Sequence, residues 1–168
     1  MSGRGTPALA ALAAAGIPHA VHEYDAPEPA GARDRDGRPH YGQDAAAALG
    51  IAPDRIFKTL VASVDGRLVV GVVPVSGELD LKALAAAAGG RRAELAPPDV
   101  AQRATGSVIG GISPLGHRRP MAVYVDSSAS AFATIFVSGG RRGLQVELAP
   151  GDLARLAGAA AARIAREP

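Results

Sequence analysis

The chain has 168 residues, 48% of them hydrophobic, which is enough apolar material for the core of one domain. It contains no cysteine, and this excludes disulfides, thiolate nucleophiles and Cys-ligated metal sites. Its formal net charge is only +2, and no apolar run approaches the roughly 18 to 20 residues of a membrane span. With no signal-peptide pattern at the start of the sequence, we expect a soluble cytoplasmic protein with no membrane partner.

The first forty residues favour a helix, then a strand, then a loop. Thr6 can cap a helix that begins at Pro7, and Gly16 can end it. Residues 17–24 alternate loosely enough for a strand. Residues 25–40 consist of proline, glycine and charged residues with almost nothing to bury, so we expect a mobile loop there.

A hairpin is the strongest signal in the middle of the chain. Residues 56–64 and 67–75 are apolar runs joined by Asp65-Gly66, a pair typical of a tight two-residue turn. Lys58 lies within the first run, where a lysine either reaches outward from the sheet edge or points into a cleft. Lysine is rare in this arginine-rich chain, which makes Lys58 a candidate site residue.

The remaining segments alternate short helices with strands. We expect helices at 43–49, 81–88, 97–103 and 127–131, strands at 91–95, 121–125, 133–137 and 144–148, and a closing amphipathic helix from residue 150 onward. Strands in hairpins, interrupted by helices, predict a single α+β domain spanning residues 1–168 with a mixed, mostly antiparallel sheet.

A glycine-rich stretch, AQRATGSVIGGISPLG at residues 101–116, holds no Asp, Glu, Lys or His. Glycines let backbone N–H groups converge on an anion or on a polarised carbonyl oxygen. The alternative is a surface loop with bulges. Ser113 is a poor acyl-enzyme candidate, because Leu115 stands where a GxSxG motif requires glycine. His117 is the histidine best suited to acid or base chemistry, and the four histidines have no metal-binding spacing.

Four separated motifs resemble the YbaK/EbsC family of aminoacyl-tRNA deacylases, relatives of the editing domain of bacterial prolyl-tRNA synthetases. The motifs are RIFKTLV, VVPVSGELDLKAL, AQRATGSVIGGISPLG and FATIFVSGGRRGLQVELAPGDLARL, and they occur in the family's order over nearly the whole chain. The resemblance implies a mixed, barrel-like sheet flanked by helices. It also implies that the chain binds the acceptor end of an aminoacyl-tRNA, and we expect no cofactor and no metal.

The resemblance also assigns candidate site residues. Lys58 of FKTL, followed by Thr59, matches the family's key lysine, which is expected to hold the terminal adenosine and the neighbouring phosphate of the tRNA. Tyr24 matches a tyrosine that borders the substrate crevice, and Tyr41 stands where the family has an aromatic residue.

Other positions would shape the pocket around the ester. Gly110 and Gly111 begin GGISP, which fits a GxxxP loop that is thought to grip the aminoacyl carbonyl; Pro114 ends that loop, and Gly106 lies just before it. Further along, Ser138 begins the SGG turn that resembles another piece of the pocket wall. Gln145 departs from the family, because relatives with LDIEL have an acidic residue at this position.

The expected activity is hydrolysis of mischarged Cys-tRNA(Pro), because the best known family members perform it. The protein offers no convincing nucleophile, and the resemblance implies that the cysteinyl thiol attacks its own ester while Lys58, Gly110 and Gly111 act as catalytic residues. Two alternatives stay open: a deacylase for another mischarged tRNA, such as Ala-tRNA(Pro), and a non-catalytic module that binds tRNA or a nucleotide. Family members often dock onto prolyl-tRNA synthetase, which makes that enzyme a candidate partner.

Three arginine pairs could contact phosphates if they share a face, although such pairs are more often plain solvated surface. They are Arg91-Arg92, Arg118-Arg119 and Arg141-Arg142.

Overall fold

The computed structural model of the chain describes residues 5–26 and 41–167, and only the backbone of Tyr41. Its helices are α1 (Pro7–Ala15), α2 (Tyr41–Leu49), α3 (Leu81–Ala87), α4 (Pro98–Thr105) and α5 (Pro150–Ala157), with a 3-10 helix at Ser127–Ala131. None of the helices in the described ranges is long and apolar enough to cross a membrane. The predicted loop at 25–40 lies, from residue 27 onward, outside the described residues.

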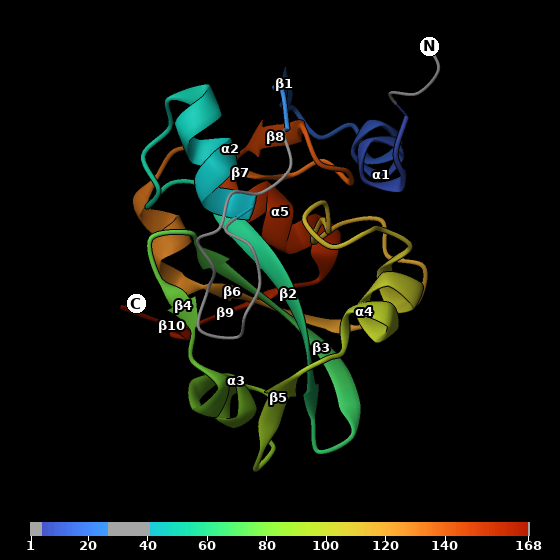
Figure 1. The fold of residues 1–168 in the computed structure, drawn as a ribbon, viewed down its shortest axis with the longest axis vertical. Coiled ribbons are helices and arrows are strands. Elements are labelled where there is room, and N and C mark those ends of the chain that lie inside the picture. Colours follow the sequence, from blue (N-terminus) through green and yellow to red (C-terminus); the bar gives the residue numbers. More distant parts are fainter. Residues whose placement is uncertain (1–4, 27–40, 168) are drawn as a thin grey trace.

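The strands form three sheets (Figure 1). They are β1 (Ala20–Glu23), β2 (Phe57–Val64), β3 (Arg67–Pro74), β4 (Glu78–Leu79), β5 (Ala93–Leu95), β6 (Ala122–Asp126), β7 (Ile135–Ser138), β8 (Leu144–Leu148), β9 (Ala160–Ala162) and β10 (Ala165–Arg166). A five-stranded sheet has the order β5-β2-β3-β6-β9, a three-stranded sheet the order β1-β8-β7, and β10 pairs with β4.

The fold confirms the predicted α+β class with a mixed, mostly antiparallel sheet. Pairings β3–β6 and β6–β9 are parallel, and the other five are antiparallel. The barrel-like closure implied by the family resemblance is not observed, since the sheets remain separate ladders. A parallel bridge between Ile56 and Phe136 joins the start of β2 to β7.

The predicted hairpin at Asp65-Gly66 is confirmed. β2 and β3 pair from Phe57↔Pro74 to Val64↔Arg67. At the turn, Asp65 has φ of 49° and Gly66 has φ of 86°, as a two-residue turn between twisted strands requires. The hairpin therefore fixes which side chains of β2 share a face, because alternate residues of a strand point to opposite sides.

The two faces of this hairpin pack into different cores. On one face, Phe57 and Val61 join a cluster that includes buried residues of α1, α5, β7 and β8. On the other face, Ala62 and Val73 pack with α3. A smaller cluster places α2 over Ile56, Val75 and Phe136. The helices thus cover both sides of the five-stranded sheet.

The prediction of a closing helix from residue 150 onward is wrong beyond Ala157. α5 ends at Ala157, and Gly158 follows in the left-handed conformation with φ of 63°. Residues beyond it form β9, parallel to β6, and β10, antiparallel to β4. Neighbouring strands offer hydrogen-bonding partners to this alanine-rich run, so tertiary pairing decides in favour of strand over helix.

Asp126 fastens this C-terminal segment. Its carboxylate accepts hydrogen bonds from the N–H groups of Ile164 and Ala165, each at 2.9 Å, and from Ser128 N–H at 3.2 Å. Burial raises the pKa of the Asp126 carboxyl, but the hydrogen bonds from Ser128, Ala165 and Ile164 outweigh burial, so its pKa lies below the ordinary value. The carboxylate therefore stays ionised and holds two segments of the chain together.

Asp126→Asn should destabilise the fold by about 2 kcal/mol, because hydrogen bonds to a buried carboxylate are lost or weakened. Chemical denaturation measures the change, and faster amide exchange at residues 164–165 should accompany it. The folded-state pKa is lowered, so the wild-type advantage should be complete above the ordinary carboxyl pKa and should vanish as pH falls through the lowered one. Asp99→Asn is the control. Asp99 forms an exposed ion pair with Arg103 on α4, so its substitution should change the free energy of unfolding very little. Equal stability of the two variants would contradict this role.

Candidate functional site

Four polar residues lie in one row across neighbouring strands. Register pairs His22 with Gln145 and Gln145 with Ser138. Lys58 follows Ile56 by two residues, as Ser138 follows Phe136, and Ile56 and Phe136 are bridged in parallel. Residues two apart on a strand share a face. His22, Gln145, Ser138 and Lys58 therefore occupy the same face, and we call them the polar row.

Helix α2 lies against the Lys58 end of the polar row. A Cβ atom at Gly42 would lie 2.3 Å from Val75 Cγ1 and 3.9 Å from Lys58 Cβ, so only glycine fits this close approach. The amide of Gln43 donates to the Val75 carbonyl at 2.7 Å. The backbone of Tyr41, the first residue of α2, thus starts beside Lys58.

Tyr24 belongs to the same region. Its side chain packs on the cluster that contains Ile56 and Phe136, and its N–H donates to the Gly143 carbonyl at 3.0 Å. The fold therefore brings together five of the predicted site residues, which are Tyr24, Tyr41, Lys58, Ser138 and Gln145.

Gln145 and Ser138 differ in how their polar atoms are used. Gln145 is 7% exposed, and its buried Oε1 accepts no hydrogen bond from a described residue. Ser138 Oγ donates to the Gly111 carbonyl at 2.9 Å and accepts from Gly140 N–H at 3.1 Å. Both hydrogen-bonding positions of the Ser138 hydroxyl are therefore used within the protein, whereas the Gln145 amide has a buried oxygen without a partner among the described residues.

The glycine-rich loop reaches the polar row through Gly111. A Cβ atom at Gly111 would lie 2.6 Å from Arg141 Cα, so the loop and the turn after β7 touch backbone to backbone. The Gly111 N–H donates to the Val108 carbonyl at 2.9 Å, whereas no described residue accepts from the N–H of Gly110. Gly110, with φ of 92°, is therefore the better placed of the two predicted backbone donors.

Three predicted site residues lie away from the polar row. Thr59 points to the opposite face of β2 from Lys58, and its buried Oγ1 has no partner among the described residues. Gly106 ends α4 in the left-handed conformation with φ of 83°. Pro114 lines a pocket of about 370 Å³ between α1, α5 and the segment after the loop. One part of the glycine-rich loop, at Gly111, therefore lies beside the polar row, whereas Gly106 and Pro114 lie away from it.

Ser113 and His117 are structural in this conformation. Ser113 is buried, its Oγ accepts from Leu115 N–H at 3.2 Å, and its carbonyl lies 2.6 Å from Nε2 of His117, which must donate. Burial lowers the pKa of His117, against the opposing effect of the Ser113 hydrogen bond. The imidazole is therefore neutral at physiological pH and fixes the loop.

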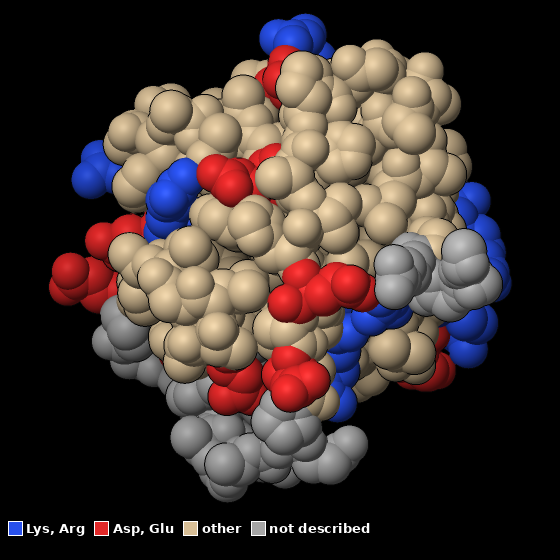
Figure 2. Space-filling model, turned by 90° about the horizontal axis from the view of Figure 1, so that it is seen from above, with Lys and Arg blue, Asp and Glu red and all other residues tan. Residues whose placement is uncertain are grey.

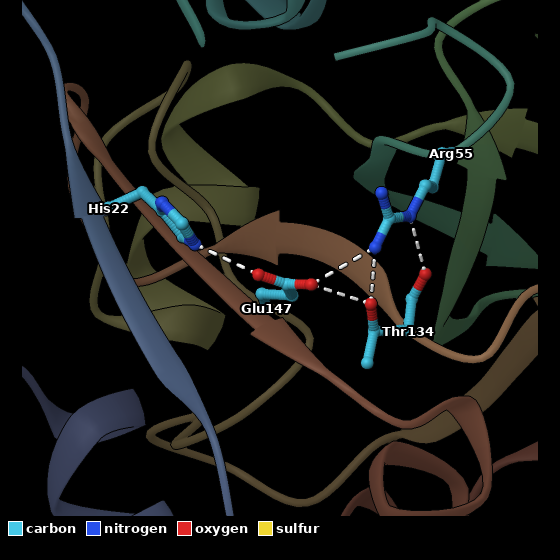
Figure 3. A network of polar contacts seen from close by, with 4 residues as sticks. All are labelled: His22, Arg55, Thr134 and Glu147. Atoms are coloured by element: carbon cyan, nitrogen blue, oxygen red, sulfur yellow. Dashed lines mark hydrogen bonds and ion pairs between the residues drawn. The ribbon is translucent and has the colours of Figure 1, made fainter.

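A network that the sequence analysis missed borders the polar row (Figure 3). Glu147 accepts from His22 Nε2 and from Arg55 Nη2, each at 3.0 Å, and from Thr134 Oγ1 at 2.6 Å. His22 and the Arg55 guanidinium also lie over Phe136, each about 5.1 Å from its ring centroid. The network ties β1, β8, the segment before β7 and the segment before β2 together.

A periodicity argument could have found part of this network. Glu147 follows Gln145 by two residues on β8, so the two side chains share a face. Arg55 and Thr134 lie outside the strands, and no sequence pattern brings them to Glu147. Among the described residues, no group of three or more His, Asp or Glu side chains is arranged to hold a metal ion.

Comparison with known proteins identifies the family. The family model of the aminoacyl-tRNA editing domain matches residues 40–156, well over half of the chain. The chain belongs to the aminoacyl-tRNA editing domain family. The matched range contains every predicted site residue except Tyr24.

Relatives in this editing family are similar over part of their length. EbsC of Enterococcus faecalis (strain ATCC 700802 / V583), provisionally designated a Cys-tRNA(Pro)/Cys-tRNA(Cys) deacylase, is 42% identical over 110 residues, which are 64% of this chain and 66% of EbsC. The proline–tRNA ligase of Moorella thermoacetica (strain ATCC 39073 / JCM 9320) is 37% identical over 68 residues, which are 40% of this chain and 12% of the ligase. The chain thus spans just under two thirds of EbsC.

A solved structure agrees with the family assignment over almost the whole chain. The crystal structure of a protein provisionally described as a trans-editing enzyme for prolyl-tRNA synthetase has a TM-score of 0.77 at 25% identity, covering 96% of this chain and 98% of that protein. The editing-domain fold therefore includes β1, which carries His22 and ends one residue before Tyr24.

Glu147→Gln should loosen the network and destabilise the protein by about 1 to 2 kcal/mol, because it removes the charge on which three donors converge. The hydrogen bond from Thr134 contributes most to lowering the pKa of Glu147, and His22 and Arg55 lower it further against the effect of burial. The stabilisation should be complete above the ordinary carboxyl pKa and lost as pH falls through the lowered one. Denaturation of the wild type and the variant between neutral and acid pH measures this stabilisation. If the difference in their free energies of unfolding stayed the same at every pH, the role of the Glu147 charge would be contradicted.

Gly111→Ala should cost about 1 to 3 kcal/mol, because the new methyl group would meet the backbone of Arg141. Gly151→Ala is the matched control, because Gly151 lies in α5 and the new Cβ would lie 3.8 Å from Arg155 Nη1, an ordinary contact distance. Alanine also favours a helix more than glycine does. Thermal unfolding of both variants measures the difference. A Gly111 variant as stable as the Gly151 variant would show that the loop and turn do not need this contact.

Proposed function

We propose that this chain is a trans-editing aminoacyl-tRNA deacylase that hydrolyses mischarged Cys-tRNA(Pro). The observation that carries the proposal is membership of the editing family together with 42% identity to EbsC. Lys58, Ser138 and Gln145 share one face, which supports the proposal because they offer a cation and a buried acceptor in one place. Gly111 accepts a hydrogen bond from Ser138 and so brings the loop that carries Gly110 to this face.

Lys58 is proposed to hold the terminal nucleotide of the tRNA. It lies at the start of β2, on the face covered by α2, and an ammonium group can bind a phosphate from several directions. The ester of the last nucleotide would then lie near Ser138, the neighbour of Lys58 in the polar row. A lysine at this place positions the substrate and does not have to take part in proton transfer.

The N–H of Gly110 is the proposed donor to the ester carbonyl. A preorganised backbone N–H stabilises the oxyanion that develops during ester cleavage, and one such donor contributes roughly 3 to 4 kcal/mol in enzymes where it has been removed. Gly111 supports this role indirectly, because its carbonyl and its close contact with Arg141 hold the loop beside Ser138.

The nucleophile is proposed to come from the substrate. Ser138 Oγ is already committed as donor to Gly111 and acceptor from Gly140, which makes it a poor nucleophile. The cysteinyl thiolate can attack its own carbonyl carbon and release the 3′-oxygen of the tRNA, which takes up a proton. Water then opens the resulting cyclic thioester, so that the overall reaction is hydrolysis.

Gln145 favours a second candidate, a deacylase for Ala-tRNA(Pro) or another mischarged small amino acid. Its neutral amide stands where relatives have an acidic residue, and its Oε1 is buried without a partner among the described residues. A pocket alone discriminates poorly between small side chains, since one methylene changes binding by only about 1 to 3 kcal/mol. Parallel assays with Cys-, Ala- and Ser-tRNA(Pro) decide, because self-attack demands a thiol. A non-catalytic tRNA-binding module would protect the ester in all three assays. For the deacylase, we propose that prolyl-tRNA synthetase is the partner that supplies recognition of tRNA(Pro).

Lys58→Ala should lower kcat/KM for Cys-tRNA(Pro) about ten- to a hundredfold, because a charge-assisted contact contributes about 1.5 to 3 kcal/mol. Lys82→Ala is the matched control, since Lys82 is the other lysine and is exposed on α3. Single-turnover deacylation measures both variants. Wild-type rates for Lys58→Ala would remove Lys58 from the proposed site.

A further inference from the structure

A second cationic surface lies on the other side of the glycine-rich loop. Arg118 N–H donates to the Thr105 carbonyl at 3.2 Å, and Arg119 N–H donates to the Ala104 carbonyl at 3.1 Å. These bonds fasten the segment after the loop to the last turn of α4, which carries Arg103. We call Arg103, Arg118 and Arg119 the α4 arginine surface; all three residues are exposed.

The charge of this surface is mostly uncompensated. Arg103 pairs with Asp99 at 3.4 Å, whereas Arg118 and Arg119 have no ion pair with a described residue. In Figure 2, Lys and Arg side chains line the right-hand edge of the molecule, which is the side on which α4 lies in Figure 1. Other Lys and Arg side chains lie at the top and left of Figure 2, so this surface is one of several positive patches on a protein with a net charge of +2.

The α4 arginine surface is also hollowed. Arg118 borders both a pocket of about 280 Å³, lined by Arg103, Gly106 and Ser107, and the pocket of about 370 Å³ that Arg119 and Pro114 line. Its side chain lies over Gly106, where a Cβ atom would be 3.5 Å from Arg118 Nε. Two adjoining hollows with a shared guanidinium suit an extended anion better than a compact one.

We propose that the α4 arginine surface binds the phosphate backbone of the tRNA acceptor stem, while the 3′ end occupies the polar row. This inference rests on the proposed function, which supplies the tRNA. Guanidinium groups bind phosphate oxygens in a bidentate manner and are weakly hydrated, so exposed arginines favour RNA over an apolar protein surface. Gly106 and Pro114, which lie away from the polar row, would then lie beside the bound RNA.

The glycine-rich loop sets the distance between the two contacts. Gly106, beneath Arg118, and Gly111, beside Ser138, are five residues apart, so they lie within about 18 Å of each other. Stacked nucleotides advance by roughly 3.4 Å each, so this upper limit corresponds to at most about five nucleotides. An acceptor end held at the polar row therefore brings the first phosphates of the stem within reach of Arg118 and Arg119.

Binding of uncharged tRNA(Pro) transcript to the full chain, measured by fluorescence anisotropy between 0.05 and 1 M salt, tests the proposal. The double variant Arg118→Ala with Arg119→Ala should reduce the slope of log affinity against log salt by about 1.4 to 1.8, since each phosphate contact contributes about 0.7 to 0.9. With affinities that converge at 1 M salt, the loss at 0.1 M is about 25- to 60-fold.

The matched control is Arg91→Ala with Arg92→Ala, which removes the same charge from another exposed pair. The backbone N–H groups of Arg91 and Arg92, not their side chains, hold Asp65 at the hairpin turn, so this variant should fold normally. It should keep the wild-type salt slope. Equal losses in both variants, or an unchanged slope for the Arg118 and Arg119 variant, would overturn the proposal.

The outcome is separable from that of the proposed function. If the wild-type chain bound tRNA with the expected slope difference but cleaved no aminoacyl ester, the function would fail and the surface would stand. If it cleaved Cys-tRNA(Pro) and the two double variants bound tRNA alike, the surface would fail and the function would stand. Weaker binding to prolyl-tRNA synthetase with unchanged tRNA binding would mark the surface as a protein contact, and would also overturn it.

Discussion

The parallel contact between the segment that contains Ile56 and the segment that contains Phe136 is the constraint on which the site depends. It brings β7 beside the start of β2, and so joins the three-stranded sheet to the five-stranded one. Without it, Lys58 would belong to one sheet while Ser138 and Gln145 belonged to another. The network of Arg55, Thr134 and Glu147 reinforces this junction directly beside the bridge.

Close backbone approaches complete the site where side chains would be too large. Gly42 lets α2 settle over Lys58 and Val75, and Gly111 lets the loop touch the turn after β7. In both cases the space is filled by a neighbour, so the glycine serves packing. The prediction that glycines in the loop face a ligand therefore applies best to Gly110, whereas Gly111 and Gly106 have structural reasons for being glycine.

The glycine-rich loop separates two kinds of chemistry. At its Gly111 end the loop accepts a hydrogen bond from Ser138, the strand neighbour of Gln145. Its Gly106 end meets exposed arginines, an environment suited to phosphates. Under the proposed function, one loop would lie beside both parts of a single extended ligand, and its lack of acidic residues fits a role beside phosphates.

The sequence by itself determined the local structure: the β2–β3 hairpin through Asp65-Gly66, the cap of α1 at Thr6, and the family through its ordered motifs. These features depend on residues that are close in the sequence, so they can be predicted from the sequence alone. Only the tertiary structure decided that the C-terminal alanine run forms strands, that Lys58 shares a face with Ser138, and that Glu147 binds Arg55 and His22. Each of these depends on strand pairing between distant segments, whose register no local pattern encodes.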